Sequence, residues 1–272
     1  MSDTTAERPA PAGRSSSPAT RYRRSLWLLT KRDLRVRYST SALGYLWSIL
    51  DPLLMAGIYW FVFTQVFNRD SVGHHPYIVF LLSALLPWMW FTGSVSDATR
   101  AFTREAKLIR STTIPRSIWV LRLVCSKGLE FLFSLPVLAA FAIWTGAELR
   151  WEIVFFPVAI VLQAILIFGI GLIVAPLVVF FRDLERAVKL VLRFMFYASP
   201  IIYGLADLRD LGLHQLAAFN PLFGIFSLYR AAFFEGQLDW YVIGVGAAIS
   251  VALLVIGLLV FRRAIPTVLK EM

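Results

Sequence analysis

The residue types that most often carry catalysis are few in this chain, and their spacing does not suggest an active site. There are three histidines and one cysteine, Cys125, so no intrachain disulfide and no cysteine metal cluster can form. The sequence contains no G-x-x-x-x-G-K-S/T phosphate loop, no H-E-x-x-H and no G-x-S-x-G. The adjacent His74 and His75 fit an outer loop better than a metal site. We therefore predict no metal, no cofactor and no nucleotide hydrolysis on this chain itself.

Acidic residues offer little more for catalysis. A membrane glycosyltransferase needs carboxylates near the membrane surface, either to hold a metal or to activate an acceptor. The acids that fall on the predicted outer side are scattered and form no catalytic pair: Asp70, Glu148, Glu152, Asp207, Asp210, Glu235 and Asp239. A membrane enzyme of this kind is therefore the least favoured function, and we expect a protein that is not an enzyme.

Aromatic side chains are the residues with the clearest chemical use. Aromatic rings stack on the C–H faces of sugars and can guide a long polar chain without holding it. Packing against lipid or against neighbouring helices is the competing interpretation, and spacing alone does not separate the two. Trp60 and Phe196 also lie in the apolar runs, and the candidates for a translocation path are Tyr59, Trp88, Trp90, Phe91, Phe194 and Tyr197.

The composition indicates the elements that must position these rings. The chain has 272 residues, of which 58% are apolar and 16% are charged, and its mean hydropathy is +0.69. A soluble domain usually has about a quarter of its residues charged. Several apolar runs here reach the roughly 18 residues that a membrane-crossing helix needs. The sequence therefore predicts an all-α protein that crosses the membrane several times.

Six apolar runs are candidate spans: 42–67, 77–96, 118–145, 153–181, 188–203 and 240–261. Lys and Arg are enriched on the cytoplasmic side of membrane proteins, and only Arg69, Arg150, Arg209 and Arg230 fall on the outer side of this arrangement. The pattern predicts six spans with both termini in the cytoplasm. Because the net charge of +10 lies mainly beside the apolar runs, it favours membrane topology and anionic lipid over nucleic acid.

The segments between the spans carry further expectations. Residues 1–20 are predicted to be a disordered cytoplasmic tail, and 21–40 an amphipathic helix at the membrane interface. Its apolar side includes Tyr22, Leu26, Leu29 and Val36, although Asp33 and Arg37 intrude there. This helix would serve either as a lipid anchor or as a docking surface for a cytoplasmic partner. Residues 204–238 are predicted to form an outer re-entrant or interfacial pair of short helices with a turn at Asn220-Pro221.

Charged and small residues within the spans predict specific contacts. Lys127 and Glu130 are three residues apart and are expected to pair, and Glu185 is expected to pair with Lys189. Asp183 is expected to cap the following helix, and Gly169 with Gly171 to permit close helix packing. Asp51, followed by Pro52, lies inside the first span and should face protein or water.

Four runs of the sequence together resemble one family. They are LLTKRDLRVRYSTSALGYLWSILDPLLMAGIYWFVFTQVF, TREAKLIRSTTIPRS, FFRDLERAVKLVLRFMFYASPIIY and FNPL. In this order they resemble the permease subunit of type 2 ABC exporters for polysaccharide, including O-antigen, teichoic acid and galactan. The resemblance implies a homodimer of six-span subunits in the bacterial cytoplasmic membrane, bound to two copies of a separate ATPase that holds ATP and magnesium. An exporter of a drug or a small lipid from the same superfamily is the alternative.

The resemblance also implies roles for particular segments. Residues 22–39 resemble the interface helix, Thr103–Ser111 the coupling helix, and 204–236 the short helices that close the outer mouth. The implied ATPase-coupling residues are Arg32, Arg35, Arg104, Glu105, Lys107, Leu108 and Arg110. The substrate of such systems is a glycan on a polyprenyl pyrophosphate lipid, and the cations expected to attract the pyrophosphate are Arg37, Lys127 and Arg193, with Arg35 beside them. For each cation, a role in membrane orientation alone is the competing interpretation.

Overall fold

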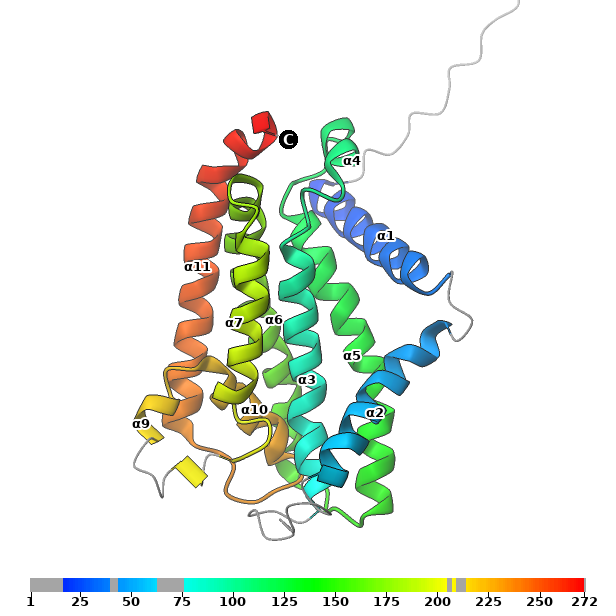
Figure 1. Ribbon diagram of the computed structural model, residues 1–272, viewed down its shortest axis with the longest axis vertical. Helices are drawn as coiled ribbons and strands as arrows, with labels where there is room; N and C mark the ends of the chain where they lie inside the picture. The colour runs from blue at the N-terminus through cyan, green and yellow to red at the C-terminus, as the bar shows by residue number, and fades with distance from the viewer. Residues whose placement is uncertain (1–16, 40–43, 63–75, 205–206, 209–213, 272) are drawn as a thin grey trace, which may run out of the picture.

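Helices are the only regular elements among the residues that the structure, a computed structural model, describes: 17–39, 44–62, 76–204, 207–208 and 214–271. The long helices run side by side as a bundle (Figure 1). This arrangement confirms the predicted all-α class. The predicted outer loop with His74 and His75 lies outside the described residues.

Within the described part of the chain, four helices are long and apolar enough to cross a membrane. They are α3 (Tyr77–Ala98), α5 (Ile118–Trp144), α6 (Phe156–Phe180, preceded by the 3₁₀ turn η3, Trp151–Phe155) and α11 (Trp240–Glu271). The first three match predicted spans closely. The fourth continues ten residues beyond the predicted end at Phe261, because Arg262 and Arg263 are favourable helix residues and do not terminate it.

Two shorter helices occupy the other predicted spans. Helix α2 (Trp47–Trp60) follows the 3₁₀ turn η1 (Gly44–Leu46), and α7 comprises Leu184–Ala198. Helix α7 ends five residues before the predicted boundary because Ser199 precedes a proline and has extended backbone angles, φ −112° and ψ 153°. Asp183 occupies the N-cap position of α7, but its side chain makes no capping hydrogen bond because its backbone is already helical, so that part of the prediction is wrong.

Helix α1 (Pro18–Tyr38) lies against the bundle beside the start of α5 (Figure 1). It begins three residues before the expected boundary because the Ser17 hydroxyl accepts a hydrogen bond from the Thr20 N–H at 3.3 Å, and Pro18 suits the first helical position. Leu29 is buried against the bundle, whereas Val36 is 63% exposed. Leu29 of the predicted apolar side therefore faces the bundle, whereas Val36 of the same side is exposed.

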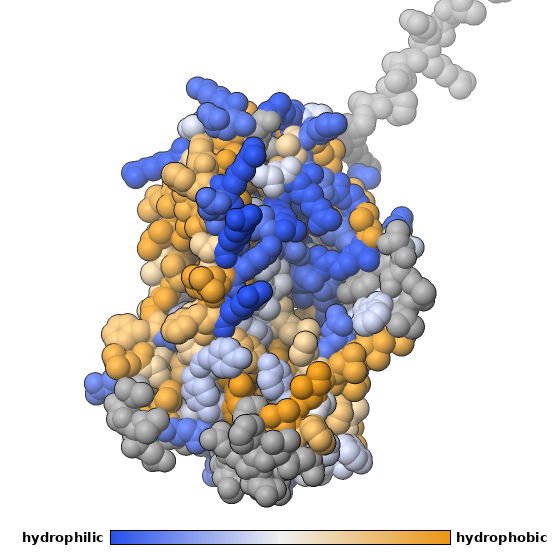
Figure 2. Space-filling view, in the orientation of Figure 1, coloured by the Kyte–Doolittle hydropathy of each residue, from blue (hydrophilic) through white to orange (hydrophobic). Residues whose placement is uncertain are grey.

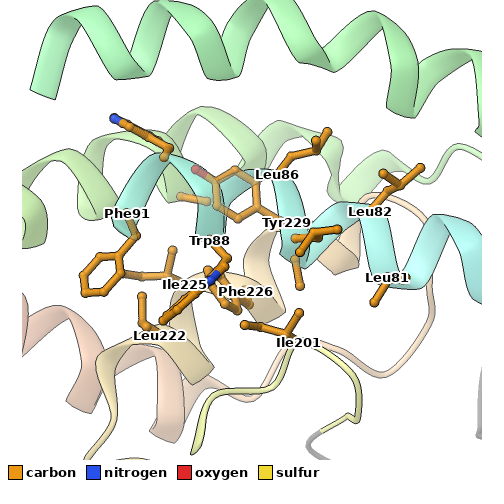
Figure 3. Packing of buried hydrophobic residues seen from close by; sticks show 14 of the residues in the cluster. Leu81, Leu82, Leu86, Trp88, Phe91, Ile201, Leu222, Ile225, Phe226 and Tyr229 are labelled. Atoms are coloured by element: carbon orange, nitrogen blue, oxygen red, sulfur yellow. The ribbon is translucent and has the colours of Figure 1, made fainter. Parts of the chain in front are cut away.

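Two short helices, α9 (His214–Ala217) and α10 (Pro221–Ala231), lie in the segment where a pair of short helices is predicted. The Asn220 side chain accepts a hydrogen bond from the Leu222 N–H at 3.1 Å and so caps α10 at the predicted turn. Helix α10 is a core element: Leu222, Ile225, Phe226 and Tyr229 pack towards α3 (Figure 3).

Helices α6 and α11 approach each other closely through glycine. A Cβ atom at Gly169 would lie only 2.6 Å from the backbone nitrogen of Leu254, and a Cβ at Gly257 would collide with the Gly169 carbonyl. At Gly171 a Cβ would lie 2.8 Å from the side chain of Val120. The prediction of close packing at Gly169 and Gly171 is confirmed.

The two ends of the bundle differ in what they carry. Helix α4 (Ala106–Ser111), the start of α1 and the end of α11 lie at one end, and α9 and α10 lie at the other (Figure 1). We call the first the α4 end. It is the end where the charged residues of the site described below gather.

Candidate functional site

A network of ion pairs attaches α1 to the bundle at the α4 end. Arg32 donates to Glu105 at 2.6 Å, and Arg122 of α5 pairs with Asp33 of α1. Arg122 also lies 3.7 Å from Glu105, so the two pairs form one cluster. The Arg122 side chain is only 4% exposed, and burial raises the pKa of Asp33 although Arg122 and Arg32 oppose this effect.

A second cluster continues the network towards the middle of the bundle. Arg37 of α1 donates to Asp97 of α3 at 2.8 Å and to Glu130 of α5 at 2.7 Å. Lys127 donates to the same Glu130 at 2.8 Å, which confirms the predicted Lys127–Glu130 pair. Two of the cations expected to attract a pyrophosphate, Arg37 and Lys127, are thus held by carboxylates.

Cavities accompany both clusters. A cavity of about 600 Å³ lies between α1, α3 and the turn before α4, and Arg32, Arg37, Arg100 and Arg104 are among its lining residues. Another, of about 340 Å³, lies between α2, α3 and α5. Asp51 lines it together with Arg37 and Lys127, so this carboxylate faces protein and an open cavity, as predicted.

Helix α4 presents exposed cations beyond these clusters. Arg104, Lys107 and Arg110 are exposed, whereas Ile109 is fully buried and anchors the helix. The residues that the family resemblance implies for ATPase coupling therefore fall into an exposed group and a paired or packed group. Arg35 joins the exposed cations, while Glu105 and Arg32 pair with each other and Leu108 packs against the core.

Most of the candidate path aromatics form one cluster where α2, α3 and α7 meet. The Trp88 ring lies 5.7 Å from Phe196 and 5.5 Å from Phe91, measured between centroids. Tyr59 stacks on Phe196 at 5.7 Å, and Tyr197 lies edge-on to it at 5.2 Å. The structure thus brings together the rings of four predicted path residues, with Phe196 at the centre.

Two predicted path residues lie elsewhere. Trp90 is two residues from Trp88 and so lies about 200° away around α3. It stacks on Phe131 at 5.3 Å and donates to the Val124 carbonyl at 3.0 Å, which are packing contacts. Phe194 is 70% exposed and makes none of the ring contacts that define the cluster. The competing interpretation, packing against a helix or lipid, fits both.

A basic stripe on α7 lies beside the aromatic cluster. Arg186, Lys189 and Arg193 follow each other at spacings of three and four residues, which places them on one side of the helix, and all three are exposed. Arg182, which is also exposed, lies in the turn two residues before the helix begins. Figure 2 shows hydrophilic residues in a column over the position of α7. Lys189 and Arg193 line a cavity of about 390 Å³ together with Trp88 and Phe196.

The carboxylate of Glu185 pairs with one cation of this stripe. It accepts from Lys189 at 2.7 Å, the predicted pair, and from Arg100 in the turn after α3 at 2.9 Å. Arg182, Arg186 and Arg193 have no acidic partner among the described residues.

Comparison with known proteins agrees with this geometry. A family model described as "ABC-2 type transporter" matches residues 24–234. The chain belongs to the ABC-2 type transporter family. The O-antigen export system permease protein RfbA of Klebsiella pneumoniae is 37% identical over 240 residues, which cover 88% of this chain and 91% of that protein. RfbA of Myxococcus xanthus is 33% identical over 235 residues, covering 86% and 89%.

A more distant relative matches over the same extent. The polysialic acid transport protein KpsM of Escherichia coli is 24% identical over 239 residues, covering 85% of this chain and 90% of that protein. The family resemblance stated from the sequence is confirmed. This ABC-2 permease is a multi-pass protein of the inner membrane and a component of a transporter, not an enzyme.

Sequence reasoning named most residues of the site but not its long-range contacts. Asp33 and Arg37 were recognised as charges on the apolar side of α1, and that irregularity was the available signal for pairing with the bundle. Arg100 carried no such signal, because its partner Glu185 lies 85 residues away in the chain. Among the described residues no group of three or more His, Cys, Asp or Glu side chains could hold a metal.

Proposed function

We propose that this ABC-2 permease moves a polysaccharide across the cytoplasmic membrane, driven by a separate ATPase. The observation that carries the proposal is the match to O-antigen export permeases over nearly the whole chain. The aromatic cluster supports it, because Trp88, Phe196 and Tyr197 supply ring faces of the kind that stack on sugars, beside the basic stripe of α7.

The proposed membrane arrangement has six crossings with both chain ends in the cytoplasm. Helices α2 and α7 are the shorter crossings, and α9 and α10 are re-entrant elements at the outer side. Charge distribution supports this orientation, since Lys107, Arg182 and Arg262 all lie on segments at or near the α4 end (Figure 1). Burial of α10 against α3 supports a role in closing the outer mouth.

The α4 end is the proposed contact with the ATPase. Arg104, Lys107 and Arg110 are exposed there, and the Arg32–Glu105 and Asp33–Arg122 pairs connect the turn before α4 to α1 and α5. A displacement of α4 would therefore be transmitted to two other helices. Arg35 adds a fourth exposed cation on α1.

The substrate is proposed to be a glycan carried on a polyprenyl pyrophosphate lipid. Arg193 is the cation best placed for the pyrophosphate, because it is exposed, lines the cavity with Trp88 and has no acidic partner among the described residues. Arg37 and Lys127 would contribute only if Asp97 and Glu130 released them. A second copy of the chain facing α7 would enclose the stripe, which is why we propose a homodimer.

Co-expression with a candidate partner ABC ATPase tests the proposal. We expect the two proteins to co-purify with equal stoichiometry and to carry a long lipid-linked glycan, identified by mass spectrometry. A small amphiphile in place of the glycan would favour the alternative exporter class. Failure to isolate any ATPase with the chain would contradict the proposal as a whole.

Charge reversal on α4 tests the coupling assignment separately. Arg104→Glu with Lys107→Glu should abolish ATP-dependent export while the thermal unfolding temperature stays within about 2 °C, since exposed substitutions change stability by less than about 0.5 kcal/mol. Arg262→Glu with Arg263→Glu, an exposed pair on α11, is the matched control and should retain export. Normal export by the α4 variant would remove α4 from the coupling contact.

A further inference from the structure

Two adjoining cavities on the side of α1 away from α7 take no part in the proposed path. The first, of about 370 Å³, is lined by Thr20, Arg23, Arg24 and Trp27 of α1. The second, of about 410 Å³, lies between α1, α5 and α6, and its lining is almost wholly apolar. Arg23 and Trp27 line both, so a basic compartment opens directly beside an apolar groove.

The apolar groove has the depth of one membrane leaflet. Along α5 its lining runs from Leu121 to Leu132, which is about 16 Å at a rise of 1.5 Å per residue. Half of a hydrocarbon core about 30 Å thick is roughly the same length. Cys125 lies in the middle of this run, and Ile160 and Ala164 of α6 form the opposite wall. The groove thus matches one acyl chain that enters from the α4 end.

The basic compartment suits a phosphate at the mouth of this groove. Arg23 and Arg24 are exposed, and neither has an acidic partner among the described residues. Arginine binds phosphate oxygens through two parallel N–H donors. Trp27 is 58% exposed at the junction of the two compartments, and tryptophan favours the level of lipid headgroups. The charge of the basic compartment and the depth of the apolar groove therefore both fit a ligand that has a phosphate and an acyl chain.

We propose that this composite groove binds one anionic phospholipid. Its phosphate lies at Arg23 and Arg24, and one acyl chain follows α5 past Cys125 to Ala164. The ion pairs of Asp33 and Arg37 hold the second half of α1, and the lipid holds the first half. The bound lipid therefore completes the attachment of α1 to the bundle. This inference depends on the membrane location of the chain and not on the identity of its substrate.

Cys125 is the only cysteine of the chain and reports directly on the groove. The full chain, delipidated in detergent, is treated with N-ethylmaleimide, and the modification of Cys125 is followed by mass spectrometry. We expect added phosphatidylglycerol to slow the modification, and phosphatidylcholine with the same acyl chains to have little effect. Native mass spectrometry should show one retained phosphatidylglycerol per chain.

Two variants separate the headgroup contact from the groove. Arg23→Gln with Arg24→Gln should weaken phosphatidylglycerol protection about thirtyfold, since each arginine near an anionic headgroup contributes roughly 1 kcal/mol. Arg262→Gln with Arg263→Gln, also an adjacent exposed pair, should leave protection unchanged. Ala164→Phe fills the groove and should remove the retained lipid while the unfolding temperature of the lipid-free chain is maintained.

Three results would overturn the proposal. Equal protection by the two lipids would show that the headgroup is not recognised. Equal loss of protection in the α1 and α11 arginine variants would reduce the effect to general surface charge. Full protection of Cys125 in the delipidated chain would show that protein, such as a second copy of the chain, covers the groove.

Discussion

Helices α1 and α7 both carry many cations, but among the described residues only α1 has cations that pair with carboxylates from outside their own helix. On α1, Arg32 and Arg37 turn towards the bundle and meet Glu105, Asp97 and Glu130. On α7, Arg186 and Arg193 stay exposed without an acidic partner among the described residues, as does Arg182 in the turn before it. A cation of this protein therefore stabilises the packing of helices where a carboxylate from another helix pairs with it. Where no carboxylate pairs with it, the cation is available to a ligand or a partner protein.

The largest stability effect should come from the buried pair on α1. Asp33→Asn leaves Arg122 buried without its main counter-charge, which should cost about 3–5 kcal/mol of unfolding free energy. Thermal or denaturant unfolding in detergent measures the loss. Lys31→Gln, an exposed neighbour on α1, should change stability by less than about 0.5 kcal/mol. An unchanged midpoint for Asp33→Asn would show that the network does not hold α1.

The next largest effect separates a buried ring of α3 from an exposed ring of α7. Trp90→Ala removes a 4% exposed ring that stacks on Phe131, and it should destabilise the chain by about 3 kcal/mol. Tyr197→Ala on α7 removes a 70% exposed ring and should leave stability nearly unchanged while export falls. Export and unfolding measured on the same preparations check both. If Tyr197→Ala exports normally, the aromatic cluster is not part of the path.

On α7 the expected loss is in transport and not in stability. Arg186→Gln with Arg193→Gln should reduce export at least about tenfold, since one charge-assisted hydrogen bond contributes roughly 1.5–3 kcal/mol. Arg21→Gln with Lys31→Gln removes two exposed cations from α1 and serves as the matched control. Equal export by both double variants would contradict the contrast between the helices.

The smallest effect is expected at Glu185. Glu185→Gln removes an exposed pairing with Arg100 and Lys189, and such pairs contribute less than about 1 kcal/mol. Unfolding should be nearly unchanged, and export should be equal to or higher than that of the parent because Lys189 is released. A marked fall in export would show that Glu185 positions Lys189 for the substrate.

The helices were largely predictable from the sequence, whereas their pairings were not. Runs of apolar residues predicted α3, α5 and α6 closely, because the length of a span is set by the membrane itself. Local pairs such as Lys127 with Glu130 were also predicted, because helix geometry fixes which neighbours meet. The end of α11 was not, since Arg262 and Arg263 mark where a helix leaves the membrane and not where it stops.

Contacts between helices depend on how the bundle packs, which a single sequence does not state. Asp33 and Arg122 are 89 residues apart, and their meeting follows from the way α1 lies on α5. The exclusion of Trp90 from the aromatic cluster follows from helical rotation, which the sequence does contain. Considering the two sides of α3 separately would have shown that Trp88 and Trp90 do not belong to the same cluster of rings.

Measuring ATP-dependent export tests most directly whether this chain moves a polysaccharide with the help of a separate ATPase. Inside-out membrane vesicles that carry this chain and its partner ATPase receive lipid-linked polysaccharide on their outward-facing cytoplasmic side. Polysaccharide that moves into the lumen becomes protected from an added glycosidase, and this protected fraction is measured. We expect transport to require ATP and both proteins. The variant with Arg104→Glu and Lys107→Glu should have lost this transport. Transport without the ATPase, or protection that is independent of ATP, would contradict this expectation.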